Sequence, residues 1–179
     1  MAQASLNKSW NMSAPLLIAD SGPLIALARL DLLYLPSRFF AEVLVTQTVW
    51  LEATRKPKYN ELEKLERAMQ AGVIKLAANP STSPAGLPAI LFRNSIDAGE
   101  RTALILALES QGALLMDDRR ARLAAAELGL PMVGTLGLLA HGRKTGVIGP
   151  LQPMLSHLAE TGYYLPAEAM AKVLSELGE

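Results

Sequence analysis

The sequence has no cysteine, few aromatic residues and no excess of charge of either sign. Without thiols, the chain cannot form disulfide scaffolds, cysteine-ligated zinc sites or cysteine nucleophiles. Lys and Arg number 17, as do Asp and Glu, so the formal net charge is zero. A general basic surface of the kind that many nucleic-acid-binding proteins carry is therefore excluded, and any contact with nucleic acid must be local.

Long hydrophobic runs are also missing. Charged or turn-forming residues interrupt every apolar run before the roughly 20 residues that a membrane-spanning helix needs. Residues 1–15 are largely polar and lack the apolar stretch of a signal peptide. We therefore expect a cytoplasmic protein with no membrane contact, a flexible N-terminal tail over 1–15 and a single domain over 16–179.

Half of the residues are hydrophobic, and 179 residues are enough to bury one sizeable core. A chain with this many hydrophobic residues is not intrinsically disordered. Only 19% of the residues are charged, which indicates surplus apolar surface for a second copy or a partner to cover. The proline-rich stretch 77–88 is expected to be a surface loop within the single domain.

Short apolar runs alternate with helical patterns along the chain. Strands are predicted at 16–19, 42–46, 73–76, 113–116 and 131–133. Helices are predicted at 23–30, 48–55, 61–70, 97–110, 119–128, 135–144, 151–160 and 167–177. Pro23 should begin the first helix with Ser21 or Gly22 as its cap, and Gly112 should end the helix that opens at Asp97. The alternation predicts an α/β fold of three layers, with helices on both faces of a central, mostly parallel sheet of four or five strands.

Acidic residues lie close to the carboxyl ends of these strands, at the edge where open α/β sheets bind ligands. Asp20 follows the first strand, and Asp117 and Asp118 follow the fourth. Glu52 lies one turn into the helix after the second strand, and Glu100 lies in the first turn of the helix before the fourth. Carboxylates that converge repel one another, so such a group takes up protons or binds cations. Mg²⁺ and Mn²⁺ prefer oxygen ligands and support phosphodiester hydrolysis.

Each acid also has a structural interpretation. Asp20 can cap the following helix, and Glu52 can be a solvated helix residue. Asp97 and Glu100 can interact with the dipole at the start of their helix. The two adjacent acids after the fourth strand are harder to explain in this way, although one of them can cap the next helix. Only the combination of acids points to a site.

Five stretches of sequence follow one another in order: LIADSGPLIAL from residue 17, TVWLE from 48, DAGERTA from 97, LLMDDRR from 114 and VGTLG from 133. The stretch TGYYL from 161 precedes the last predicted helix. Together they resemble the PIN-domain ribonucleases, in particular the single-domain prokaryotic members related to toxins of toxin–antitoxin modules. The resemblance covers residues 16–179.

The resemblance implies a PIN-like parallel sheet between helices and an acidic cluster that uses Mg²⁺ or Mn²⁺ to hydrolyse RNA. The catalytic residues that it implies are Asp20, Glu52, Glu100 and Asp118. The metal ligands that it implies are Asp20, Glu100, Asp117 and Asp118, and Ser21 would support the site by bonding a carboxylate or a water. Many members carry a hydroxyl or amide residue just before the last acid, where this chain has Met116 and Asp117, so the direct ligand of this pair stays open. The implied partners are RNA, an antitoxin protein and a second copy of the chain.

Basic residues stand beside the acids. Arg119 and Arg120 follow the acidic pair directly and are candidate contacts for RNA phosphates, with Arg122 beside them. Two further basic spots are 143–144 and 55–58. The alternative for each is a solvated helix face.

A function of a different class also fits the acids: a non-catalytic α/β binding module whose pocket holds Mg²⁺ structurally or accepts a phosphoryl group. A response-regulator receiver of that kind has its paired acids at the first strand and a lysine after the last. Here the pair closes the fourth strand, and no lysine follows Val133 until Lys144. The sequence therefore favours a metal-dependent endoribonuclease over the binding module.

Overall fold

The computed structural model describes residues 16–55, 60–83, 85–93 and 95–179. The predicted tail over 1–15, and Lys56 and Lys58 of one basic spot, lie outside the described residues. Five strands form a sheet in the order β3-β2-β1-β4-β5, and every neighbouring pair runs parallel. The predicted α/β fold is confirmed, with five strands in a sheet that is parallel throughout.

The strands are β1 (Leu16–Ala19), β2 (Glu42–Thr46), β3 (Lys75–Ala77), β4 (Ala113–Leu115) and β5 (Met132–Val133). The helices before β4 are α1 (Ser21–Arg29), α2 (Gln47–Arg55), α3 (Glu61–Gln70) and α4 (Ala98–Ser110). Those after it are α5 (Arg119–Glu127), α6 (Thr135–Lys144), α7 (Leu151–Glu160) and α8 (Ala167–Leu177). Two short 3₁₀ helices, η1 (Pro36–Arg38) and η2 (Ala89–Phe92), were not predicted.

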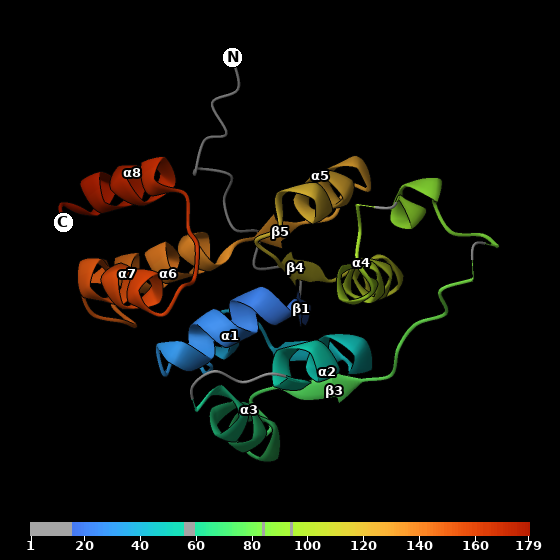
Figure 1. Ribbon diagram of the computed structural model, residues 1–179, viewed down its shortest axis with the longest axis horizontal. Helices are drawn as coiled ribbons and strands as arrows, with labels where there is room; N and C mark the ends of the chain where they lie inside the picture. Colours follow the sequence, from blue (N-terminus) through green and yellow to red (C-terminus); the bar gives the residue numbers. More distant parts are fainter. Residues whose placement is uncertain (1–15, 56–59, 84, 94) are drawn as a thin grey trace.

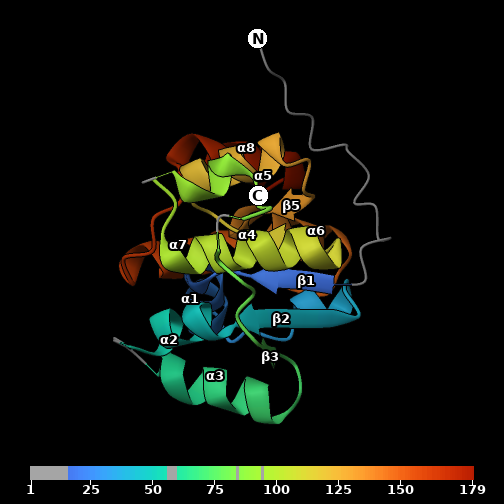
Figure 2. The same cartoon turned by 90° about the vertical axis from the view of Figure 1, so that its right-hand side faces the viewer.

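Helices cover the sheet from two sides. Helix α4 crosses one face over β1, β2 and β4, whereas α1 lies on the opposite face (Figures 1 and 2). Helices α6, α7 and α8 pack together on the α1 side, and α3 packs on α1 and α2 (Figure 1). Strands β1 and β4 are covered on both faces, so Leu17, Ile18, Leu114 and Leu115 are completely buried. None of the described helices is long and apolar enough to cross a membrane.

The chain order reverses at β1. The chain runs outward from β1 through β2 to β3, and then returns to place β4 and β5 on the other side of β1. Open α/β sheets bind ligands at such a reversal, outside the carboxyl ends of the strands. Ala19 pairs with Leu115 across the reversal, and the Asp20 N–H donates to the Leu115 carbonyl at 3.0 Å. The two strands that precede the predicted acids therefore end side by side.

Three predicted details of the elements were wrong. Helix α1 begins at Ser21 rather than Pro23, and its N-cap is Asp20 instead of Ser21 or Gly22. Gln111, with a φ of 54°, is the C-cap of α4 instead of Gly112. A Cβ at Gly112 would lie 2.3 Å from Ile18 Cδ1, so this glycine serves close packing against β1.

The third strand begins two residues later than predicted. The N–H groups of Val73 and Ile74 donate to the Ala68 carbonyl and so belong to the end of α3. Pairing with β2 begins only at Lys75. The other predicted boundaries agree with the structure to within one residue.

Candidate functional site

Asp20 lies at the carboxyl end of β1 and is only 8% exposed. Although it occupies the N-cap position of α1, its side chain makes no capping hydrogen bond, which argues against the structural interpretation. Burial raises the pKa of Asp20 to about 7; the backbone N–H of Ser21 opposes this, and the charges of Asp97, Glu100 and Glu52 add to it. Its surroundings therefore disfavour a bare carboxylate.

Three further carboxylates gather at the start of α4. Asp97 Oδ1 accepts a hydrogen bond from the Glu100 backbone N–H at 2.8 Å, and Glu100 Oε2 accepts one from the Asp97 N–H at 2.9 Å. The pair forms a capping box, which satisfies two N–H groups of the first turn. Glu52 reaches across from α2, and its Oε1 accepts a hydrogen bond from the Gly99 N–H at 3.1 Å. Helix α4 thus holds Glu52, Asp97 and Glu100 around one end.

Gly99 makes the approach of Glu52 possible. A Cβ at this position would lie 2.1 Å from Glu52 Oε2 and 2.7 Å from Glu52 Cδ. Any larger residue would push the carboxylate away from the helix end. The glycine is therefore part of the site because of its missing side chain.

Two of these acids, Glu52 and Glu100, also have raised pKa values. Burial raises the pKa of Glu100 to about 7, and the charges of Asp97, Asp118 and Glu52 act in the same direction. Burial and the charge of Asp97 raise the pKa of Glu52. The groups that act on these pKa values are other carboxylates and backbone N–H donors, not lysine or arginine side chains. Such a cluster is stabilised by protons or by a cation.

The two adjacent acids after β4 have different environments. Asp118 is exposed and caps α5, since its Oδ1 accepts hydrogen bonds from the N–H groups of Arg120 at 2.7 Å and Ala121 at 3.0 Å. Asp117 uses both oxygens: Oδ1 accepts from the Thr135 N–H at 2.8 Å, and Oδ2 accepts from the Thr135 hydroxyl at 2.6 Å and from the Tyr163 hydroxyl at 2.5 Å. Asp118 therefore keeps an oxygen available, and Asp117 does not.

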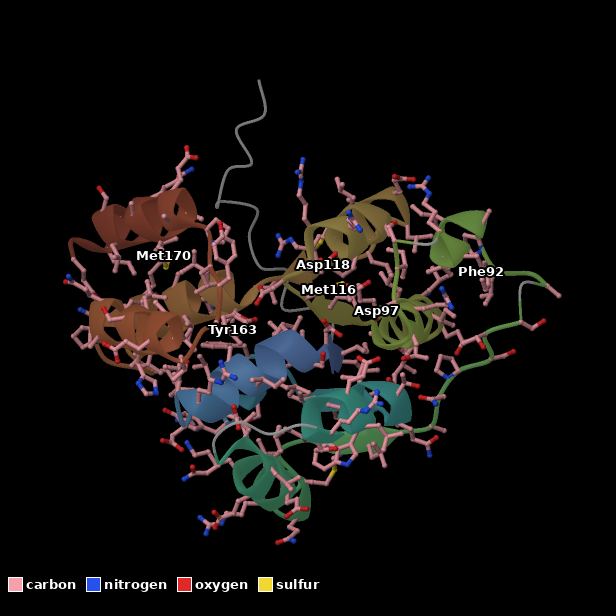
Figure 3. All side chains as sticks on the ribbon, viewed as in Figure 1. Phe92, Asp97, Met116, Asp118, Tyr163 and Met170 are labelled. Carbon is pink, nitrogen blue, oxygen red and sulfur yellow. The ribbon has the colours of Figure 1, made fainter. Side chains whose placement is uncertain are left out.

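Figure 3 shows Asp97 and Asp118 at the starts of their helices, with Met116 beside Asp118 and Tyr163 on the side of the C-terminal helices. The structure brings Asp20, Glu52 and Glu100 within electrostatic reach of one another and Asp118 within reach of Glu100. These acids thus act on the pKa values of Asp20 and Glu100, and their role as one site stays a prediction.

The carboxylates suit a hard divalent cation by type and charge. Glu52, Asp97, Glu100 and Asp118 each give one oxygen to a backbone N–H, and the second oxygen accepts no hydrogen bond from another described residue. Oxygen donors of this kind are the ligands that Mg²⁺ and Mn²⁺ prefer. Within the described part of the chain, no three Asp, Glu or His side chains are already arranged to hold a metal ion.

Sequence reasoning missed several residues of the site. Asp97 was expected only to interact with the helix dipole, yet its charge acts on three neighbouring acids. Thr46 and Thr102 are buried, and their hydroxyls lie 2.8 Å apart, joining the end of β2 to α4. A polar residue that ends an apolar strand, as Thr46 does, was the only available signal.

Ser21 is half-buried, and its hydroxyl bonds no other described residue, so its supporting role stays a prediction.

The basic residues differ in how they are engaged. Arg119 and Arg120 are exposed at the start of α5, and neither forms an ion pair with a described residue. Arg122 instead donates to the Met116 carbonyl at 3.1 Å. In the spot at 143–144, Arg143 binds Glu179 at 2.7 Å and Lys144 lies 4.0 Å from Glu176. Arg119 and Arg120, and Arg55 at the end of α2, are thus exposed arginines whose guanidinium groups form no ion pair with a described residue.

Comparison with protein-family models identifies a family for this chain. The chain fits the family model described as PIN domain over residues 16–179, which include every acid discussed above. No curated protein matches the sequence.

Proposed function

We propose that this chain, which belongs to the PIN-domain family, is a metal-dependent endoribonuclease. Proteins of this family are typically nucleases that use divalent metals. The observation that carries the proposal is the buried Asp20, surrounded by Glu52, Asp97 and Glu100 at the point where the strand order reverses. Carboxylates that cluster without basic side chains repel one another, and a bound cation would neutralise that repulsion.

We assign the acids different roles in the reaction, and the hydrogen bonds that a carboxylate already accepts count against it as a metal ligand. Asp20, Glu100 and Asp118 are the proposed metal ligands, and Asp117 is the weaker candidate because three hydrogen bonds occupy its carboxylate. Bound Mg²⁺ or Mn²⁺ would supply Lewis-acid activation of water and of the phosphodiester. Glu52, whose pKa burial raises, is the proposed acceptor of a proton from the attacking water.

Arg119 and Arg120 would hold the phosphates that flank the cut. They follow Asp118 directly, are exposed, and have no acidic partner among the described residues. Their guanidinium groups can each form two hydrogen bonds to a phosphate. The neutral chain would thus bind RNA through a local group of arginines next to the acidic cluster.

The proposal extends to a toxin role with an antitoxin partner and a homodimer, for which the family resemblance is the support. The exposed apolar side chains of Leu51 and Leu123 are consistent with a surface that a partner protein covers. The reading frame next to this gene shows directly whether an antitoxin is encoded.

Substitution of the buried aspartate tests the activity. Asp20→Asn should abolish cleavage of single-stranded RNA in Mg²⁺ or Mn²⁺, a loss of at least about 100-fold, because the amide cannot supply the charge that a cation needs. The matched control is Asp31→Asn, an exposed aspartate with a φ of 58°, a conformation that asparagine tolerates. The assay is the initial rate of cleavage, with and without EDTA.

Cleavage that survives EDTA, or that Asp20→Asn leaves unchanged, would contradict this mechanism. Metal binding by a wild-type protein that cleaves no RNA would favour the non-catalytic binding module instead.

A further inference from the structure

The Tyr163 hydroxyl lies between the two strand ends that carry the acids. It donates to Asp117 Oδ2 at 2.5 Å. A Cβ at Gly22, two residues after Asp20, would lie 3.5 Å from the Tyr163 hydroxyl oxygen. Asp117 follows β4, and Asp20 follows β1, the neighbouring strand. A single phenol thus contacts the segment after β4 and faces the segment after β1.

The chain holds Tyr163 in this place by the way α7 ends. Gly162 has a φ of 76°, and its N–H donates to the Ala159 carbonyl, while the Tyr163 N–H donates to the Leu158 carbonyl at 2.9 Å. This pair of bonds is a Schellman motif, which turns the chain sharply after the helix. The ring is partly buried and lines a cavity of about 220 Å³ between α7 and α8. Both the backbone and the ring are therefore anchored.

Three hydrogen bonds hold the Asp117 carboxylate in place, and moving it would break them. Thr135, at the start of α6, donates its N–H and its hydroxyl to the carboxylate, and Tyr163 donates the third bond. Burial and the nearby charge of Asp117 keep the pKa of Tyr163 well above its usual value, so the phenol remains a donor. The next residue, Asp118, shares its backbone with Asp117 and caps α5.

We propose that Tyr163 is a positioning residue, which acts through Asp117 to fix the turn that presents Asp118 to Glu100 and the other clustered acids. The inference rests on the proposed function, because the position of Asp118 matters for activity only where Asp118 binds a cation. Residues that hold metal ligands in place contribute to affinity without touching the metal. The last two helices of the chain would then contribute to the site through one hydroxyl.

The test compares Tyr163→Phe with Tyr164→Phe. The first variant loses the donor but keeps the ring that lines the cavity; the second removes a hydroxyl from a side chain that is 84% exposed. Titration of each protein with Mn²⁺, followed by the electron paramagnetic resonance of the free ion, gives the affinity. Tyr163→Phe should bind Mn²⁺ about 10-fold or more weakly and cleave RNA correspondingly slowly, with Tyr164→Phe equal to wild type.

Amide hydrogen exchange without metal provides a second readout. The N–H groups of Thr135, Arg120 and Ala121 bond to Asp117 or Asp118 and should exchange faster in Tyr163→Phe. Unchanged exchange would overturn the inference whatever the activity. Faster exchange with unchanged Mn²⁺ affinity would overturn it as well, because the turn would then not serve the site.

The same two readouts separate this inference from the proposed function. A wild-type protein that binds no Mn²⁺ and cleaves no RNA would contradict the proposed function and with it the purpose assigned to the turn. Wild-type cleavage with full Mn²⁺ affinity in Tyr163→Phe would contradict the inference alone.

Discussion

Asp20 is held where its own charge is unfavourable. Its usual pKa is 3.8, and burial with three acidic neighbours raises the value to about 7 in the folded protein. No side-chain cap bond offsets the cost. At the scale of the residue, the fold gives up stability to keep a carboxylate in this place, as functional sites commonly do.

The free energy of unfolding should therefore depend on pH in a defined direction. Between about pH 4 and 7 the folded protein keeps the Asp20 proton that the unfolded chain has lost, so stability falls as pH rises through this range. Without divalent metal, Asp20→Asn should be more stable than wild type at pH 8 by about 2–4 kcal/mol and similar near pH 4. Urea denaturation in EDTA at both pH values measures this.

Asp31→Asn is the control and should keep the wild-type pH dependence, since its side chain lies on the surface in an ion pair with Lys64. Part of the slope should remain in Asp20→Asn because Glu100 also titrates near pH 7. Wild type and Asp20→Asn with the same slope would contradict the burial of a titrating carboxylate.

At the scale of elements, the start of α4 organises the site. One helix end engages Asp97, Glu100 and, from α2, Glu52. The N–H groups of a first helical turn lack partners within the helix and attract negative charge. Because α2 packs against α4, the start of α4 binds a carboxylate from α2 in addition to its own two.

Gly99→Ala should separate stability from activity. Alanine favours helix over glycine by about 1 kcal/mol, and the group that it meets is the flexible end of Glu52, so unfolding should change by no more than about 1 kcal/mol. Displacing Glu52 should slow RNA cleavage by about 100-fold. Cleavage rates and urea denaturation of the variant measure the two effects.

A double-mutant cycle supplies the control. In a Glu52→Ala background, Gly99→Ala should cause no further loss of rate, because the group that it displaces is already gone. An additive loss would mean that the glycine acts through something other than Glu52.

At the scale of the whole molecule, Arg29 joins three distant parts of the chain. From the end of α1, its Nε donates to Glu61 Oε1 of α3 at 2.9 Å, and its Nη1 donates to the Thr161 carbonyl after α7 at 2.9 Å. Glu61 is 2% exposed. Figure 1 shows α1 between α3 and the group of C-terminal helices, so this pair ties together the side of the molecule opposite α4.

Arg29→Met should destabilise the protein by about 2–4 kcal/mol, because it removes the guanidinium group that bonds both the buried Glu61 carboxylate and the Thr161 carbonyl. Urea denaturation at pH 7 measures the loss. The double variant Arg29→Met/Glu61→Met removes both charges and should regain at least half of it. A double variant as unstable as Arg29→Met would show that the bond to Thr161 matters more than the ion pair.

Much of the fold could be predicted because its signals are local. Helices 61–70, 135–144, 151–160 and 167–177 have the predicted bounds, and buried strands such as β1 and β4 follow from short apolar runs. Prediction failed where packing overrides the local signal. At Gly112, contact with Ile18 requires the glycine, and Gln111 takes the left-handed conformation instead.

The sequence by itself determined the elements, the alternation that forces a parallel sheet, and the acids at strand ends, since each depends on neighbouring residues. Tertiary structure decided which distant residues donate hydrogen bonds to the acids. Gly99 donates to Glu52, 47 positions away, and Tyr163 donates to Asp117, 46 positions away. Such contacts depend on which strands are neighbours and how helices cross them, and residue spacing does not encode that. Packing alone also separates Asp117, enclosed by donors, from Asp118, which keeps an oxygen free.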